Sequence, residues 1–432
     1  MPPIDDHPLR YALTGELHAR PFPSIHPPQV VAFLAIKQAG DGAARSRDRG
    51  EDMAHLVKLL KHYGAPLPDA DATHYYGEMG KYRLKWEQHT EFVTYTAFSE
   101  DLSERPFDPA EFDVFPAQWL ESAPGQRLTS ALLRLMPAPS EPRETLAHLR
   151  EWFVPESIAV AHVLEQAAVV ATDFRIDPAG HMRFAVFAAP GTGDRRLGRI
   201  VQRLLEIETY KTMSMLGFAL TREISADVGK MDRRISDLMA KMSGKKMLAE
   251  DTLDALLDVS VELENKVAQT SFRFAGTGAY RAIVDQRISA LRETRFEGLQ
   301  GFGEFMMRRY EPAMRTVVSM QERLERMSAR ALRASDLLRT RVDVERSAQN
   351  QDILASMDRR ADLQLRLQRT VEGLSVVAIS YYAVSLAGYI LYPLTEVTGL
   401  SKGYLTAIVA LPVVLLVWTA VRRLRHTLEK DD

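Results

Sequence analysis

Hydrophobic and polar positions divide the 432-residue chain into three parts with different patterns. In residues 1–190, short apolar runs alternate with polar segments, as in a sheet with covering helices. From residue 191 onward, apolar residues recur every three or four positions, which predicts long helices. Two long runs after residue 372 lack any charge. The pattern predicts an α+β protein with an N-terminal mixed α/β domain, a long helical region with a coiled-coil-like stalk, and a C-terminal two-helix transmembrane hairpin.

The first part, residues 1–190, is predicted to be a cytoplasmic α/β domain with a small antiparallel or mixed sheet. Its expected elements are a buried strand at 30–36, a helix at 53–64, a hairpin of 82–86 with 91–98, and a strand pair that turns at 177–180. Residues 157–170 fit either a helix or a strand.

Residues 191–312 are predicted to form a helical domain, with an antiparallel helical hairpin that turns at SGKK (243–246). Residues 313–372 contain no glycine or proline and are predicted to form one stalk helix of roughly 90 Å. Such a helix needs partners, either within the chain or in copies of it. Its apolar seam has coiled-coil-like spacing and consists of Val317, Met320, Leu324, Met327, Ala331, Ala334 and Leu338.

The C-terminal runs are predicted to cross a membrane as helices over 373–395 and 403–421. A short external loop, 396–402, joins them, and a basic cytoplasmic tail, 422–432, follows. Four arginines near the ends of the spans are expected to contact lipid phosphates: Arg366, Arg369, Arg422 and Arg423. The positive-inside rule then places both termini in the cytoplasm, and we expect a bacterial inner-membrane protein with two spans.

One face of the first span carries small residues at seven-residue spacing. Gly373, Ser380 and Ala387 share this face, and Gly388 adjoins it. Small residues permit close helix packing, and they are also compatible with a narrow pore. The sequence leaves both interpretations open.

Composition and motifs argue against several classes of function. The chain has 55 basic and 57 acidic residues, so it is not a globally basic nucleic-acid binder. It has no cysteine, which excludes disulfides, iron–sulfur clusters and cysteine nucleophiles. The segment AAPGTGDRRLGRIV resembles a phosphate loop, but Arg196 stands where the dinucleotide fingerprint needs glycine. No hydrolase or kinase motif occurs, so we expect no enzyme, no catalytic residue and no cofactor.

Histidines are concentrated at the N-terminal end, where seven of the eleven lie within the first ninety residues. The candidates for a metal or acid–base site are His18, His55, His62 and His89. None of them lies in a recognised ligand spacing, so polar surface histidines are the alternative and no metal is assigned.

Several strings along the chain resemble one bacterial family of uncharacterised membrane-anchored proteins, catalogued only as a domain of unknown function. They are HPLRYALTGELHARPFP, LKWEQHTEFVTYT (84–96), GRIVQRLLEIETYKTM (198–213) and SMDRRADLQLRLQRTVEGLSVVAISYY (356–382). The resemblance covers essentially the whole chain. It implies a membrane anchor and no catalytic residue.

The predicted architecture is also similar to that of the CorA-type magnesium channels, which are homopentamers. Their GMN signature is replaced here by Gly388-Tyr389-Ile390, and the loop has Glu396 as its single acidic residue. Two functions therefore remain. The first is a membrane-anchored, self-associating scaffold that presents the α/β domain to a cytoplasmic protein partner, with membrane lipids as its other contact. The alternative is a CorA-like homo-oligomeric ion channel or transporter without the GMN filter.

Overall fold

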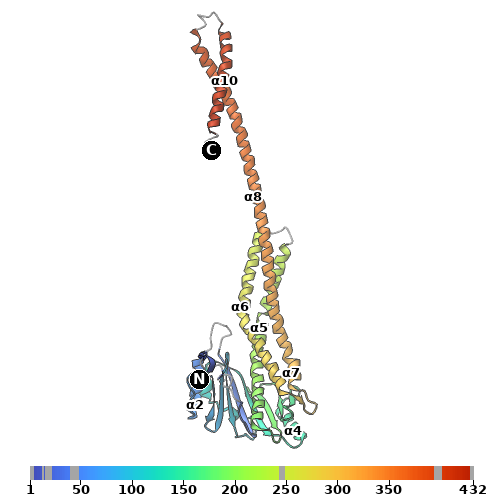
Figure 1. Ribbon diagram of the computed structural model, residues 1–432. Helices are drawn as coiled ribbons and strands as arrows, with labels where there is room; N and C mark the ends of the chain where they lie inside the picture. The colour runs from blue at the N-terminus through green and yellow to red at the C-terminus, as the bar shows by residue number, and fades with distance from the viewer. Residues whose placement is uncertain are drawn as a thin grey trace. The chain divides into compact units, whose positions relative to one another are not determined.

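The computed structural model describes residues 4–11, 14, 22–38, 48–242, 249–393 and 401–428. The chain forms two compact units, residues 1–336 and 337–432. The first contains one sheet and most of the helices, and the second contains the C-terminal part of α8 (Glu311–Ile390) together with α10 (Lys402–Leu428) (Figure 1). This architecture confirms the predicted α+β class, whereas the finer domain boundaries stay predictions.

The sheet of the first unit has nine described strands in the order β2-β3-β4-β1-β5-β8-β7-β6-β9. Neighbouring strands are antiparallel except for the parallel pair β5 and β8. The strands are β1 (Gln29–Lys37), β2 (His74–Met79), β3 (Tyr82–Gln88), β4 (Phe92–Ser99), β5 (Gln126–Pro137), β6 (Ala159–Val163), β7 (Ala168–Thr172), β8 (Met182–Ala188) and β9 (Thr294–Arg295).

The predicted strand at 30–36, the hairpin of β3 with β4, and the strand pair of β7 with β8 are confirmed. Residues 157–170, which fitted a helix or a strand, form the hairpin of β6 and β7. Its turn places Leu164, Glu165 and Gln166 at φ values of 48°, 54° and 65°, a left-handed conformation that these residue types seldom adopt. Strands β2, β5 and β9 were not anticipated, and β9 extends the sheet into the region expected to be helical.

Alternation along β1 separates the two faces of the sheet. Ala32, Leu34 and Ile36 belong to a core that includes residues of α2 (Arg49–His62), η1 (Pro109–Phe112), α3 (Ala117–Glu121) and α4 (Pro142–Trp152). Phe33 lines a space on the opposite face, opposite residues of α5 (Asp194–Met242). Both faces are therefore buried, which explains the nearly continuous apolar run of this strand.

The N-terminal half of α5 covers the sheet with Leu197, Ile200 and Leu204, each fully buried. Gly198 permits close approach of α5 to the segment that precedes β1, because a Cβ atom there would lie 1.7 Å from the carbonyl oxygen of Pro23. The segment that resembles a phosphate loop is thus a strand, a turn and a helix, and its Gly198 serves packing.

The C-terminal half of α5 forms a helical bundle with α6 (Ala249–Leu291) and with α8 up to Asp336, while α7 (Phe302–Arg309) precedes α8 (Figure 1). The first six seam residues, Val317 to Ala334, are at most 7% exposed, and Leu338 is buried as well. Arg323 donates to Asp232 of α5 at 2.8 Å, and Ser328 donates to Glu264 of α6. The predicted seam is therefore buried within the chain.

Helices α5 and α6 approach closely at Gly217, where a Cβ atom would lie 2.1 Å from the Thr277 hydroxyl and 3.0 Å from its Cβ. We expect Gly217→Ala to lower the free energy of unfolding by about 1–3 kcal/mol, because the new methyl group forces the helices apart. Gly278→Ala is the matched control, since its Cβ meets no atom within 4 Å. It should raise stability by about 0.5–1 kcal/mol. Thermal unfolding of the purified full chain measures both, and equal effects would contradict the close approach.

Candidate functional site

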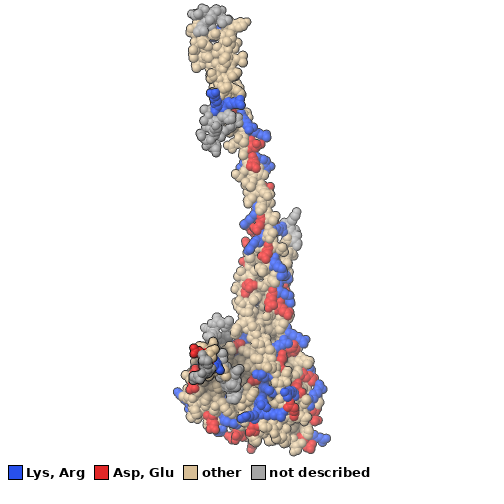
Figure 2. Space-filling model, viewed as in Figure 1, with Lys and Arg blue, Asp and Glu red and all other residues tan. Residues whose placement is uncertain are grey.

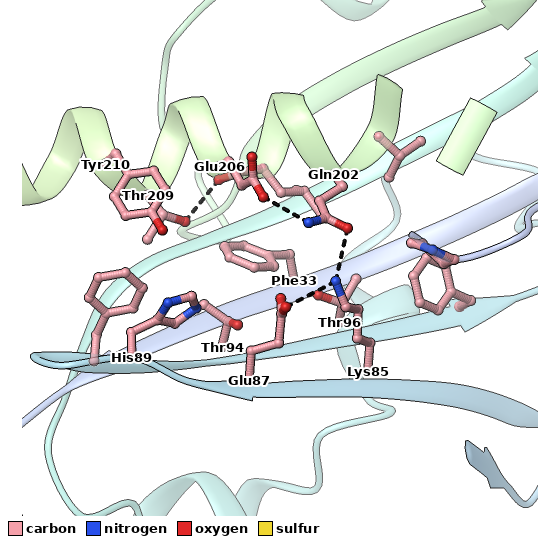
Figure 3. A pocket seen from close by; sticks show the side chains of 15 residues that line it. Phe33, Lys85, Glu87, His89, Thr94, Thr96, Gln202, Glu206, Thr209 and Tyr210 are labelled. Atoms are coloured by element: carbon pink, nitrogen blue, oxygen red, sulfur yellow. Dashed lines mark hydrogen bonds and ion pairs between the residues drawn. The ribbon is translucent and has the colours of Figure 1, made fainter. Parts of the chain in front are cut away.

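A small polar cavity lies between the sheet and α5 in the first unit (Figure 3). Phe33 of β1, Thr94 and Thr96 of β4, and Lys85 and Glu87 of β3 form one wall. Gln202, Glu206, Thr209 and Tyr210 of α5 form the other, and His89 lies at one end. The strand residues meet because β3, β4 and β1 are neighbours in the sheet, and α5, which is distant in sequence, supplies the opposite wall.

Hydrogen bonds cross this cavity from the sheet to α5. The Lys85 ammonium lies 3.1 Å from a Glu87 carboxylate oxygen and donates to the Gln202 side-chain oxygen at 2.9 Å. Gln202 in turn donates to Glu206 at 2.7 Å, and Arg287 of α6 forms an ion pair with Glu206. The chain of contacts alternates donors and acceptors, so buried charges are compensated.

The cavity itself has a volume of about 40 Å³. Such a space accommodates a few water molecules and is much smaller than a substrate pocket. The polar network therefore holds α5 against the sheet and is not a reaction chamber.

A second and larger cavity, of about 540 Å³, also lies in the first unit. It is bounded by the start of β5, the segment between β7 and β8, α5, and α7 with Tyr310. Sequence patterns did not indicate it, because its lining comes from four separate parts of the chain and follows no motif. Its volume is in the range of small-molecule sites.

His55 is a core residue of α2 and not a metal ligand. Its ring is stacked on Trp119 with centroids 4.0 Å apart, and its Nε2 lies 3.0 Å from the Trp119 carbonyl oxygen. A carbonyl only accepts, so Nε2 donates, and Nδ1 of the neutral ring accepts from the Tyr95 hydroxyl at 3.0 Å. Burial lowers the pKa of His55 to about 4, which keeps the ring neutral.

The other described histidine candidates, His62 and His89, do not gather around His55. His62 is exposed at the end of α2, and His89 is stacked on Phe92 with centroids 4.5 Å apart. His18 lies outside the described residues. Within the part of the chain that the structure describes, no group of three or more histidine or acidic side chains is placed to hold a metal ion.

Burial varies along the small-residue face of the first span, which belongs to the second unit. Ser380 is 6% exposed and its hydroxyl is buried, Ala387 and Gly388 are half-buried, and Gly373 is exposed. In α10, Val417 is buried. Burial of Ser380 is consistent with close helix packing, and packing face or pore face stays an open prediction.

Two described helices are long and apolar enough to cross a membrane. They are α8, in its C-terminal part, and residues Lys402–Arg423 of α10, and only 6% of each apolar window is buried. Figure 2 shows an uncharged surface over these spans, with basic side chains gathered at one end. The arginines expected there are exposed: Arg366, Arg369, Arg422 and Arg423. Arg366 is paired with Asp362, and the Arg422 guanidinium lies 5.2 Å from the Trp418 ring centre.

The buried ion pair of Lys85 with Glu87 in the wall of the small cavity gives one testable prediction. The Lys85 side chain is 6% exposed, so Lys85→Met leaves the Glu87 carboxylate buried without its cation. We expect the free energy of unfolding to fall by about 3–5 kcal/mol. Lys81→Met is the control, because Lys81 is 63% exposed in its pair with Asp101, and its stability should stay close to that of the wild type. Similar losses in the two variants, measured by thermal or urea unfolding, would contradict the compensating network.

His55 makes the stability of the first unit depend on pH. Its pKa is about 4 in the folded chain, below the ordinary value of 6.5, so the unfolded state binds the proton first as pH falls. Between pH 7 and pH 5 we expect this group to lower the free energy of unfolding by about 1–2 kcal/mol. Buried His181, whose pKa is also lowered by burial, acts in the same direction.

Urea unfolding at pH 7 and pH 5 checks the effect of His55. His55→Gln should reduce the loss of stability on acidification, whereas His62→Gln serves as the exposed control on the same helix. A His55→Gln protein that loses as much stability as the wild type between these pH values would show that His55 is not responsible.

A family model described as "Protein of unknown function (DUF3422)" matches residues 5–428, which is nearly the whole chain. No curated protein matches the sequence, and no comparison supports the architectural similarity to the CorA-type channels. The chain, with its α/β sheet domain, long helices and two helices capable of crossing a membrane, therefore belongs to the DUF3422 family of proteins of unknown function.

Proposed function

We propose that this protein is a non-enzymatic scaffold, anchored in the bacterial inner membrane, that self-associates and presents its α/β domain to a cytoplasmic protein partner. The observation that carries the anchor is the exposed apolar surface of the two spans. Leu374, Tyr381 and Leu411 are 66%, 70% and 75% exposed, which is unfavourable in water and favourable in hydrocarbon. Lipid tails are the natural cover for such helices.

Orientation in the membrane follows from the arginines at the ends of the spans. Arg366 and Arg369 precede the first span, and Arg422 and Arg423 follow the second. Guanidinium groups pair with lipid phosphates and favour the cytoplasmic side. Both termini, and with them the α/β domain, would then be cytoplasmic.

Self-association requires a surface that the chain does not already use. The seam from Val317 to Ala334 is buried within the first unit, so it is not available to another copy. Further along α8, in the second unit, Leu354, Met357 and Leu365 are 61%, 60% and 53% exposed. With Ala361 they recur every three or four residues. Pairing of this stripe with a second copy would give the helix the partner it needs.

The oligomeric state of the full chain in detergent tests the proposal. We expect the wild type to be an oligomer, and Leu354→Asp with Met357→Asp to dissociate it, because carboxylates in a coiled-coil seam are destabilising. Leu332→Asp is the matched control, since Leu332 is 64% exposed and lies outside the stripe. The control should keep the wild-type mass in light scattering.

A wild-type chain that stays monomeric at all concentrations would remove the self-associating scaffold. Ion flux through liposomes that carry the purified protein would instead favour the alternative function, a homo-oligomeric channel or transporter.

A further inference from the structure

The larger cavity of the first unit, here called the β5–α7 pocket, has features of a ligand site that the scaffold function does not use. It occupies about 540 Å³ between the first residues of β5, the segment that precedes β8, α5 and α7. Exposed Arg127, Ile176 and Arg309 lie among its lining residues, so the pocket opens to solvent. A small molecule has both space and access.

The lining of the pocket has a net positive charge. Arg127, Lys211 and Arg309 line it, and Glu208 is the single acidic side chain among its lining residues. Glu208 is 3% exposed and accepts hydrogen bonds from Thr129 at 3.2 Å and Lys211 at 2.7 Å. Its charge is therefore already compensated.

The two arginines differ from Lys211 in their ion pairs. Among the described residues, no carboxylate forms an ion pair with Arg127 or Arg309. They come from β5 and from the last residue of α7, so two guanidinium groups from separate elements meet at one pocket. Guanidinium groups recognise carboxylates and phosphates through paired hydrogen bonds.

The rest of the lining is mixed: Thr129, Ser130, Thr212 and Tyr310 are polar, and aromatic and aliphatic side chains make up an apolar side. Phe174 and Phe305 are stacked with centroids 4.2 Å apart, and the Lys211 ammonium lies 5.2 Å from the Phe174 ring centre. Met182 and Met215 complete this side, and methionine side chains adapt to irregular ligands. A ligand that suits this lining has an apolar body.

We propose that the β5–α7 pocket binds a small amphipathic organic anion, with one carboxylate or phosphate group at Arg127 and Arg309 and an aromatic or short alkyl body against Phe174, Phe305 and the methionines. The volume is within the range of known small-molecule pockets. This ligand site is independent of self-association through α8.

Calorimetry on the full chain in lipid nanodiscs tests the proposal, with empty nanodiscs as the blank. The probes are 4-phenylbutyrate for the carboxylate, phenyl phosphate for the phosphate, and the neutral 4-phenylbutanol for the apolar body alone. We expect saturable binding of one anion per chain that weakens with salt, and roughly tenfold or more weaker binding of the alcohol, because a charge-assisted hydrogen bond is lost. The tighter of the two anions identifies the headgroup class.

Variants locate the binding in this pocket. Arg127→Gln with Arg309→Gln should weaken binding roughly tenfold or more. Arg308→Gln is the control, because Arg308 is an exposed neighbour on α7 that does not line the pocket and donates to Gln300. Met215→Trp, at a half-buried position of α5, should block the pocket while leaving thermal unfolding near the wild-type midpoint.

Three results would overturn the proposal. They are the absence of saturable binding by either anion, equally tight binding of the neutral alcohol, and an equal loss of affinity in Arg308→Gln and in the Arg127/Arg309 double variant.

Discussion

The close packing of α5 against two different partners is the constraint on which the first unit depends. Its N-terminal half covers the sheet with Leu197, Ile200 and Leu204, and its C-terminal half packs in the bundle of α6 and α8 through residues such as Val228 and Ile235. Glycine permits a close approach in each half, at Gly198 against Pro23 of the segment before β1 and at Gly217 against Thr277 of α6. A continuous helix of 49 residues thus links the sheet to the bundle.

This packing also produces the two cavities of the first unit, which differ in size and chemistry. Glu206 and Glu208 are two residues apart on α5 and therefore point in different directions. Glu206 joins the network of Gln202 and Arg287 at the small cavity, whereas Glu208 accepts from Thr129 and Lys211 at the β5–α7 pocket. At the small cavity, the polar side chains compensate buried charges. At the larger cavity, two arginines and a surface of aromatic and methionine side chains are available to a ligand.

The apolar surface of α8 changes its role along the helix. Up to Ala334 its apolar residues are buried in the bundle, and at Leu354 and Met357 side chains of the same kind are exposed. From Leu374 onward the exposed apolar residues form a stretch that is long enough to cross a membrane. Apolar side chains of this one helix therefore face three different environments, which are the rest of its own chain, a second copy and the membrane. The second copy and the membrane are part of the proposed function.

The sequence by itself determined the features that depend on local periodicity. These are the long helices, the two spans, the strand at 30–36 and the hairpin of β3 and β4, because apolar spacing and turn residues act over a few positions. Tertiary structure decided the rest. It placed the seam of α8 within the chain, fixed His55 as a neutral core residue between Tyr95 and Trp119, and brought Arg127 and Arg309 to one pocket. Each of these outcomes depends on which distant segments pack together, and no pattern of neighbouring residues encodes that choice.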